Sequence, residues 1–127
     1  MSRGFLIDSH VVLWSLDAPE RLRAETQKIL QSDERLWFSI ASLWELSIKA
    51  SLGKMSPVDA QFLQIIGERG IRILPIKPEH IWALSALPFH HRDPFDRMLI
   101  AQAQAENLPI ITADRMVANY DVTIIPA

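Results

Sequence analysis

The chain has 127 residues, of which 49% are hydrophobic and 22% charged, and its formal net charge is −2. This length and composition fit a single folded domain spanning residues 1–127 and exclude a disordered chain. Without cysteine, the chain has no disulfide, no thiolate zinc site and no cysteine nucleophile. No apolar run approaches the roughly 20 residues that cross a bilayer, and Asp8 comes too early for a signal peptide. We therefore expect a cytoplasmic protein with no membrane partner.

Short apolar runs recur along the chain and predict five strands, at residues 5–7, 36–38, 71–74, 109–111 and 122–125. Because the runs are continuously apolar, they favour strands that are buried on both faces of a parallel sheet. The segments between them have helical periodicity. Strands that alternate with helices predict an α/β fold with three layers, in which helices cover both faces of the sheet.

The helix boundaries are predicted from capping residues and prolines. We expect a short helix after Asp8, a second one that begins near Pro19, and a third with Ser39 as its N-cap and Gly53 as its stop. Ser56 is expected to cap a fourth helix, with a proline next to it and an acid three residues later. Further helices are expected to begin at 77–79 and 93–96, and a short one after Asp114.

Four acidic residues are predicted to meet at one edge of this sheet. Asp8 follows the first strand, Asp114 follows the fourth, Asp96 lies in the first turn of the helix before the fourth strand, and Glu45 lies in the helix after the second. Ligands of open parallel sheets bind outside the carboxyl ends of the strands, so these side chains are candidates for one site.

Each acid also has an ordinary structural interpretation. Asp8, Asp96 and Asp114 all suit the N-terminus of a helix, and Glu45 could pair with Lys49 one turn later. Spacing alone leaves the two interpretations about equally supported.

Four sequence blocks resemble the PIN domain family, and in particular the VapC-like toxins of bacterial toxin–antitoxin modules. The resemblance extends over essentially the whole chain, and its four blocks come in the family's order: FLIDSHVVLW (5–14), SIASLWELSIK (39–49), HRDPFDRMLIAQA (91–103) and LPIITAD (108–114). The resemblance implies a five-stranded parallel sheet of order 3-2-1-4-5. It also implies that Asp8, Glu45, Asp96 and Asp114 are the catalytic, metal-binding residues of an endoribonuclease.

The expected chemistry is hydrolysis of RNA phosphodiester bonds. Hard carboxylate oxygens suit Mg²⁺ or Mn²⁺, and a water activated by the metal would attack phosphorus in line. The resemblance further implies a cognate antitoxin protein and a homodimer. Because the net charge is −2, bulk electrostatics does not attract RNA, so metal ions and local arginines must do so.

Other polar residues beside the acids are candidates for supporting roles. Ser9 and Thr112 could orient the carboxylates, with helix capping as the alternative, and Asp93 is expected to be an N-cap rather than a ligand. We expect no catalytic histidine, and we place the four tryptophans in the core. The arginines that could contact RNA phosphates are Arg92, Arg97 and Arg115.

Three rival functions share parts of this pattern. An aspartyl-phosphate phosphatase needs a second Asp two residues after Asp8, where this chain has His10. A DNA nuclease and a catalytically silent PIN-fold binding protein both stay open. The sequence gives no way to assess contact with the sugar's 2′-hydroxyl, and it does not by itself show turnover.

Overall fold

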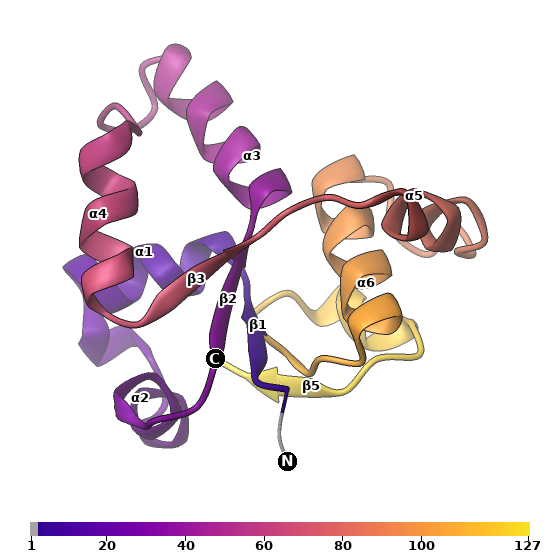
Figure 1. Cartoon of the computed structure of the whole chain (residues 1–127), viewed down its shortest axis with the longest axis horizontal. Coiled ribbons are helices and arrows are strands. Elements are labelled where there is room, and N and C mark those ends of the chain that lie inside the picture. The colour runs from indigo at the N-terminus through magenta and orange to yellow at the C-terminus, as the bar shows by residue number, and fades with distance from the viewer. Residues whose placement is uncertain (1–2) are drawn as a thin grey trace.

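The computed structural model describes residues 3–127. A five-stranded parallel sheet runs through the middle of the molecule in the order β3-β2-β1-β4-β5, as predicted (Figure 1). The strands are β1 (Phe5–Ile7), β2 (Leu36–Ser39), β3 (Ile71–Leu74), β4 (Ile110–Thr112) and β5 (Ile124–Pro126). Since β1 and β4 are neighbours and the chain runs outward from each of them, the strand order reverses between these two strands.

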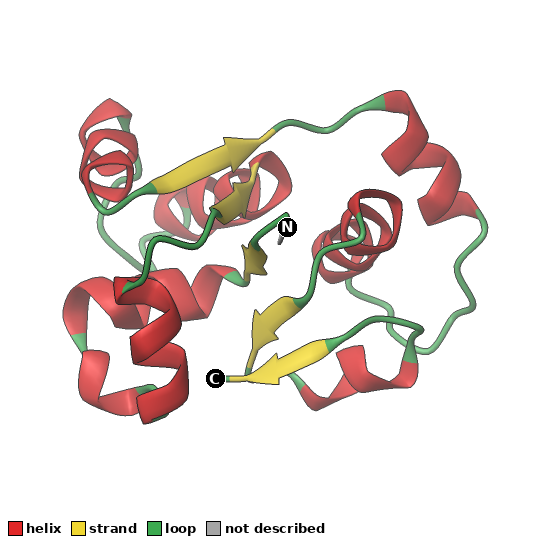
Figure 2. Ribbon diagram, turned by 60° about the horizontal axis from the view of Figure 1, so that its bottom comes forward, coloured by secondary structure: helices red, strands yellow, loops and turns green. Residues whose placement is uncertain are grey.

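Helices cover both faces of the sheet (Figure 2). In chain order they are α1 (Ser9–Asp17), η1 (Pro19–Arg21), α2 (Ala24–Gln31), α3 (Ile40–Ser51), α4 (Ala60–Glu68), α5 (Pro78–Ser85), α6 (Pro94–Glu106) and η2 (Arg115–Asn119).

Successive residues of each strand enter two separate cores. Leu6 and Ile110 pack with α5, α6 and η2, whereas their neighbours Ile7 and Ile111 pack with α1 to α4, and all four side chains are fully buried. This is the alternation that a strand imposes on its side chains. The continuously apolar runs therefore reflect a sheet that is covered on both faces.

The helix expected from Pro19 is divided in two. Pro19 begins the short 3-10 helix η1, and then Leu22 and Arg23 adopt extended conformations before α2 begins. Leu22 is buried, and the Arg23 N–H donates to the carbonyl oxygen of Ala127, the last residue, at 2.8 Å. This long-range hydrogen bond replaces one that a continuous helix would make, and sequence periodicity carries no sign of it.

Two further boundaries differ from the sequence prediction. Asp59, not Ser56, is the N-cap of α4, and its carboxylate accepts from the N–H groups of Gln61 and Phe62 at 3.0 and 3.3 Å. Strand β5 begins at Ile124 and includes Pro126, which a strand at the edge of a sheet tolerates because its outer N–H position has no partner.

Two of the tryptophans expected in the core are exposed. Trp44 is 59% and Trp82 69% exposed, so both predictions were wrong. On α3 the buried residues are Ala41, Ser42 and Leu46, which places Trp44 on the outer side of the helix, edge-on to Phe95 with ring centroids 5.1 Å apart. An apolar run therefore does not reveal which of its members faces solvent.

Gly4 is the residue whose replacement is expected to damage the start of the sheet most. Its φ is +107°, and an added Cβ would lie 2.2 Å from the Arg35 carbonyl oxygen, which also accepts the Phe5 N–H. Gly4→Ala is expected to lower the free energy of unfolding by at least about 2 kcal/mol, through backbone strain and a steric clash.

Gly67 offers the matched control for this change. It lies in α4 with nothing near its added Cβ, so Gly67→Ala should raise the free energy of unfolding by about 0.5–1 kcal/mol. Urea unfolding of both variants measures the contrast. If both variants changed the free energy of unfolding by equally small amounts, the strained geometry at Gly4 would be contradicted.

Candidate active site

A pocket of about 420 Å³ lies at the carboxyl ends of β1 and β4, where the strand order reverses. The four predicted acids all line it, although they come from segments far apart in the sequence. The lining residues are Asp8, His10, Trp14, Glu45, Lys49, Asp93, Asp96, Ala113 and Asp114. The pocket is thus predominantly acidic, with Lys49 as its single lysine or arginine.

Asp8 is positioned by the sheet and by two hydroxyl groups. It follows β1, and its backbone N–H continues the pairing with β4 by donating to the Ile111 carbonyl at 3.0 Å. The Thr112 Oγ1 donates to Asp8 Oδ2 at 2.7 Å, and the Ser9 Oγ lies 3.4 Å from Oδ1. Asp8 occupies the N-cap position of α1, but its side chain makes no capping hydrogen bond there, so its carboxylate is not used to cap the helix.

Glu45 reaches the same pocket from α3. The Ser9 Oγ lies 3.1 Å from Glu45 Oε1, so one buried hydroxyl stands between the carboxylates of Asp8 and Glu45. The prediction that Ser9 and Thr112 contact the acids agrees with these distances. Their hydroxyls hold oxygen atoms that would otherwise repel one another, and hydrogen-bonded carboxylates of this kind are typical of metal sites.

The first turn of α6 supplies two more carboxylates. Asp93 is the N-cap, as predicted, and its Oδ1 accepts from the N–H groups of Phe95 and Asp96 at 2.8 and 3.1 Å. Asp96 points into the pocket. Burial, and then the charges of Asp93, Asp8 and Glu45, raise the pKa of Asp96 from 3.8 to about 7, although His91 acts in the opposite direction.

Asp114 is the N-cap of η2 and comes two residues after the end of β4. Its Oδ1 caps this helix by accepting from the Met116 N–H at 2.9 Å, and its own N–H donates to the Thr112 Oγ1 at 3.0 Å. Its other oxygen, Oδ2, faces the pocket. Capping and a role in the pocket are therefore compatible, because each uses a different oxygen of the carboxylate.

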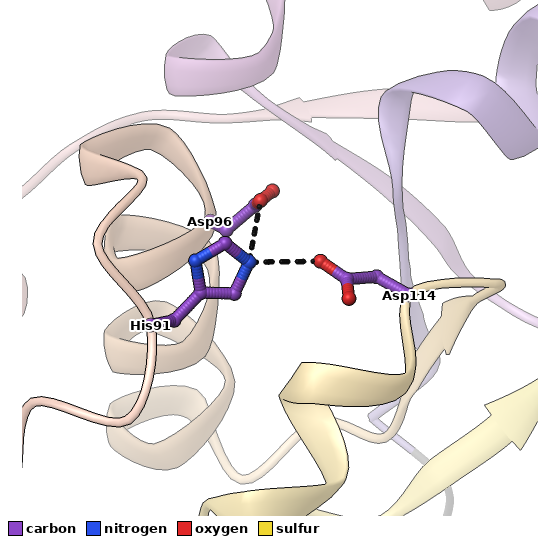
Figure 3. A group of neighbouring side chains, drawn as sticks. All are labelled: His91, Asp96 and Asp114. Carbon is purple, nitrogen blue, oxygen red and sulfur yellow. Dashed lines mark hydrogen bonds and ion pairs between the residues drawn. The ribbon is translucent and has the colours of Figure 1, made fainter.

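His91, which contacts two of the acids that line the pocket, is the residue at this site that the sequence analysis missed. Its Nε2 lies 2.9 Å from Asp114 Oδ2 and 3.1 Å from Asp96 Oδ2 (Figure 3). Burial lowers the pKa of His91, but the hydrogen bond to Asp114 and the charges of Asp96, Asp114 and Asp93 outweigh it, so the pKa is raised. The available sequence signal was its place two residues before an N-cap, where a side chain can reach the first turn of the helix.

The three candidate arginines divide into two groups. Arg92 and Arg115 are exposed, next in sequence to Asp93 and Asp114. Arg97 is only 8% exposed and points away from the surface, so the predicted contact with RNA does not fit its placement.

The guanidinium of Arg97 is engaged inside the protein. It donates to the carbonyl oxygens of Pro88, Leu84 and Leu87 at 2.9, 3.5 and 3.5 Å, and to the Tyr120 hydroxyl at 3.3 Å. These carbonyls belong to the end of α5 and the loop that leads to α6. Arg97 thus fixes the segment that carries His91.

The pocket meets the requirements of a divalent cation. Glu45, Asp93 and Asp96 each offer an oxygen, and these three atoms lie within 4.8 Å of one another, as do the nearest atoms of His91, Asp96 and Asp114. Oxygen ligands suit hard cations such as Mg²⁺ or Mn²⁺. The pKa of Asp96 is raised by burial first and then by the neighbouring negative charges, and a bound cation would favour the ionised carboxylate against both.

Fold and site together define a class of α/β protein that gathers carboxylates for cation chemistry at the switch point of a parallel sheet. A family model described as the PIN domain matches residues 5–122. The chain belongs to the PIN domain family.

Two curated relatives are nucleases. Over 123 residues the chain is 32% identical to Ribonuclease VapC22 of Mycobacterium tuberculosis, a match that covers 91% of this chain and 90% of that protein. A shorter match of 84 residues, 37% identical, is to the tRNA-splicing endonuclease subunit SEN2 of Eremothecium gossypii. It covers 58% of this chain but only 24% of that larger protein.

Solved structures share the fold at low sequence identity. VapBC2 from Rickettsia felis, in a structure bound to a DNA fragment from the promoter, matches with a TM-score of 0.75 and 14% identity, over 95% of this chain and 96% of that one. Within residues 3–127, no helix is long and apolar enough to span a membrane.

Proposed function

We propose that this chain is a metal-dependent endoribonuclease and the toxin of a toxin–antitoxin pair. The observation that carries the proposal is the convergence of Asp8, Glu45, Asp96 and Asp114 on one pocket at the switch point of the sheet. Membership of the PIN family and the match to a ribonuclease over nearly the whole chain support RNA as the substrate.

The pocket's residues have distinct tasks in this proposal. Asp8, Glu45 and Asp96 hold the cation, with Asp114 as a further ligand or as a group that orients the others, and Ser9 and Thr112 fix the carboxylates of Glu45 and Asp8. Mg²⁺ or Mn²⁺ bound there supplies a Lewis acid that neutralises phosphate charge and activates water. Lys49 and the exposed Arg92 and Arg115 contact RNA phosphates around this centre.

The partners follow from the same assignment. A cognate antitoxin is part of the proposal because the solved structure of similar fold from Rickettsia felis is a VapBC complex. A homodimer is expected from the family. A cytoplasmic location, where RNA and a newly made antitoxin are both present, belongs to the same proposal.

The decisive experiment is cleavage of single-stranded RNA by the purified, antitoxin-free chain. We expect cleavage with Mg²⁺ or Mn²⁺ that leaves 5′-phosphate and 3′-hydroxyl ends, and loss of this cleavage with EDTA or with Asp8→Asn. Asp59→Asn is the matched control, since it makes the same substitution at an exposed N-cap of α4, where asparagine caps about as well.

Each alternative has its own outcome. Cutting of the matching DNA strand at an equal or higher rate would identify a DNA nuclease. Confirmed cation binding without cleavage across total cellular RNA would support a catalytically silent binding protein. Cleavage that survives both EDTA and Asp8→Asn would place the chemistry elsewhere and overturn the assignment.

A further inference from the structure

His91 connects two carboxylates that come from different parts of the fold. Its Nε2 lies 3.1 Å from Asp96 Oδ2, at the start of α6, and 2.9 Å from Asp114 Oδ2, at the start of η2 (Figure 3). The side chain is 12% exposed, and those of Asp96 and Asp114 are 20% and 29% exposed. Two carboxylates that would repel each other are thus bridged by one ring nitrogen.

The other ring nitrogen shows which role Nε2 has. The backbone N–H of Asp93 donates to His91 Nδ1 at 3.1 Å, so Nδ1 must present its lone pair. In the neutral ring the single proton then resides on Nε2, which donates to Asp114 Oδ2 and has Asp96 Oδ2 as a second oxygen at 3.1 Å. A nitrogen that binds a metal needs a free lone pair, which Nε2 lacks in this tautomer.

The main chain of His91 is anchored as firmly as its ring. The N–H groups of His90 and His91 both donate to the Tyr120 hydroxyl, at 3.0 and 2.8 Å, and Arg97 also reaches this hydroxyl. Tyr120 is 5% exposed. The loop between α5 and α6 is therefore tied to Tyr120 at the C-cap of η2, whose N-cap is Asp114. This geometry sets the ring before any cation arrives.

We propose that His91 is a positioning residue that holds Asp96 and Asp114 in place for the cation, because its single Nε2–H donates to Asp114 Oδ2 and lies beside Asp96 Oδ2, without itself binding the cation. The inference rests on the proposed metal-dependent function of the pocket. Hydrogen bonds to metal-binding carboxylates orient them, and their loss typically lowers metal affinity by about 10–100-fold. Asp93 then has two tasks, since its carboxylate caps α6 and its N–H selects the tautomer of His91.

Two substitutions separate a hydrogen-bond donor from a metal ligand. Gln places an N–H group near the position of His Nε2 but has no ring nitrogen to bind a metal, whereas Leu removes the donor and roughly keeps the volume. In calorimetric titrations with MgCl₂ and MnCl₂, we expect His91→Leu to lose about tenfold or more in affinity for both cations. His91→Gln should recover most of that loss. His90→Gln, at the exposed neighbour, should leave both affinities unchanged.

A ligand role predicts a different pattern. Gln would then recover no more of the affinity than Leu does, because neither side chain has a ring nitrogen with a free lone pair. That pattern would overturn the proposal, as would unchanged or higher affinity in His91→Leu. A higher affinity in His91→Leu would mean that the imidazole competes with the cation for the carboxylates.

The unmodified protein provides a second test, which does not depend on whether a variant folds. The ¹⁵N resonances of the His91 ring, recorded in alkaline buffer, should show the tautomer protonated on Nε2, both without cation and at saturation with Mg²⁺. A move of the proton to Nδ1 on addition of Mg²⁺ would mean direct ligation and would contradict the proposal. Neither measurement uses RNA, so a chain that binds Mg²⁺ but cuts no RNA would refute the ribonuclease and leave the role of His91 standing.

Discussion

Asp96→Asn is expected to abolish RNA cleavage and, in the absence of divalent cations, to stabilise the fold. The loss should be about a thousandfold or more, because a cation contributes several kcal/mol of charge stabilisation and each factor of ten corresponds to about 1.36 kcal/mol. The gain in stability follows from the same carboxylate. Burial and the charges of Asp93, Asp8 and Glu45 make its ionised form unfavourable in the folded protein.

The pH dependence of this stabilisation has a definite sign. The pKa of Asp96 is about 7 in the folded protein against an ordinary 3.8, so between these values the folded state binds more protons than the unfolded state. The free energy of unfolding therefore falls as pH rises from about 4 to about 7. Asparagine removes this contribution. The raised pKa of His91 acts in the same direction, and its part of the slope becomes smaller in the variant because the charge of Asp96 is one of its causes.

Thermal unfolding in EDTA at about pH 4.5 and about pH 8 measures the effect. Asp96→Asn should melt higher than the parent chain at the upper pH and nearly equally at the lower one. Added Mg²⁺ should raise the melting temperature of the parent chain at the upper pH and that of the variant much less, since a ligand that binds only the folded state stabilises it. An Asp96→Asn variant that is less stable than the parent chain at the upper pH would mean that Asp96 has a structural partner rather than a cation-binding role. Asp59→Asn again controls for loss of one acid.

Much of this site could be predicted from sequence because the strands determine it. Asp8 directly follows an apolar run, and Asp114 comes three positions after Ile111. Ile7 pairs with Ile111 in the register of the sheet, so the residues beyond them meet at one edge. The Asp93-Pro94 pair indicated the start of α6 and thereby placed Asp96 in its first turn. These are local signals, and each depends on only a few neighbouring residues.

The contacts that hold the site residues in place could not be predicted in this way, because they join segments that are far apart in the sequence. His91 is 23 positions from Asp114 and Arg97 is 23 positions from Tyr120, and nothing in the local pattern indicates either contact. Arg97 shows the difficulty well. Its place beside Asp96 in sequence suggested a surface cation near the acids, yet residue 97 is one position further around α6 and faces the interior.

Arg97→Met is expected to destabilise the protein by about 3 kcal/mol and to lower its melting temperature by roughly 10 °C. The substitution keeps the unbranched stem but leaves buried acceptors in the α5–α6 loop without their charged donor. Truncating one partner of a buried, hydrogen-bonded charge costs far more than removing an exposed one. Arg92→Met, on the exposed side of the same loop, should change the free energy of unfolding by no more than about 0.5 kcal/mol.

Stability and activity together distinguish the two possible roles of Arg97. An arginine that contacts RNA would lower cleavage when replaced and leave the melting temperature unchanged. In the structural role that we assign, the replacement first loosens the loop and lowers stability. His91 is then no longer held by Tyr120, and cation affinity falls as a consequence. Arg97→Lys keeps the charge but cannot reach several carbonyls with one planar fork, so its melting temperature should lie between those of Met and the parent chain. If Arg97→Lys or Arg97→Met were as stable as the parent chain and bound RNA weakly, Arg97 would be assigned to RNA contact instead.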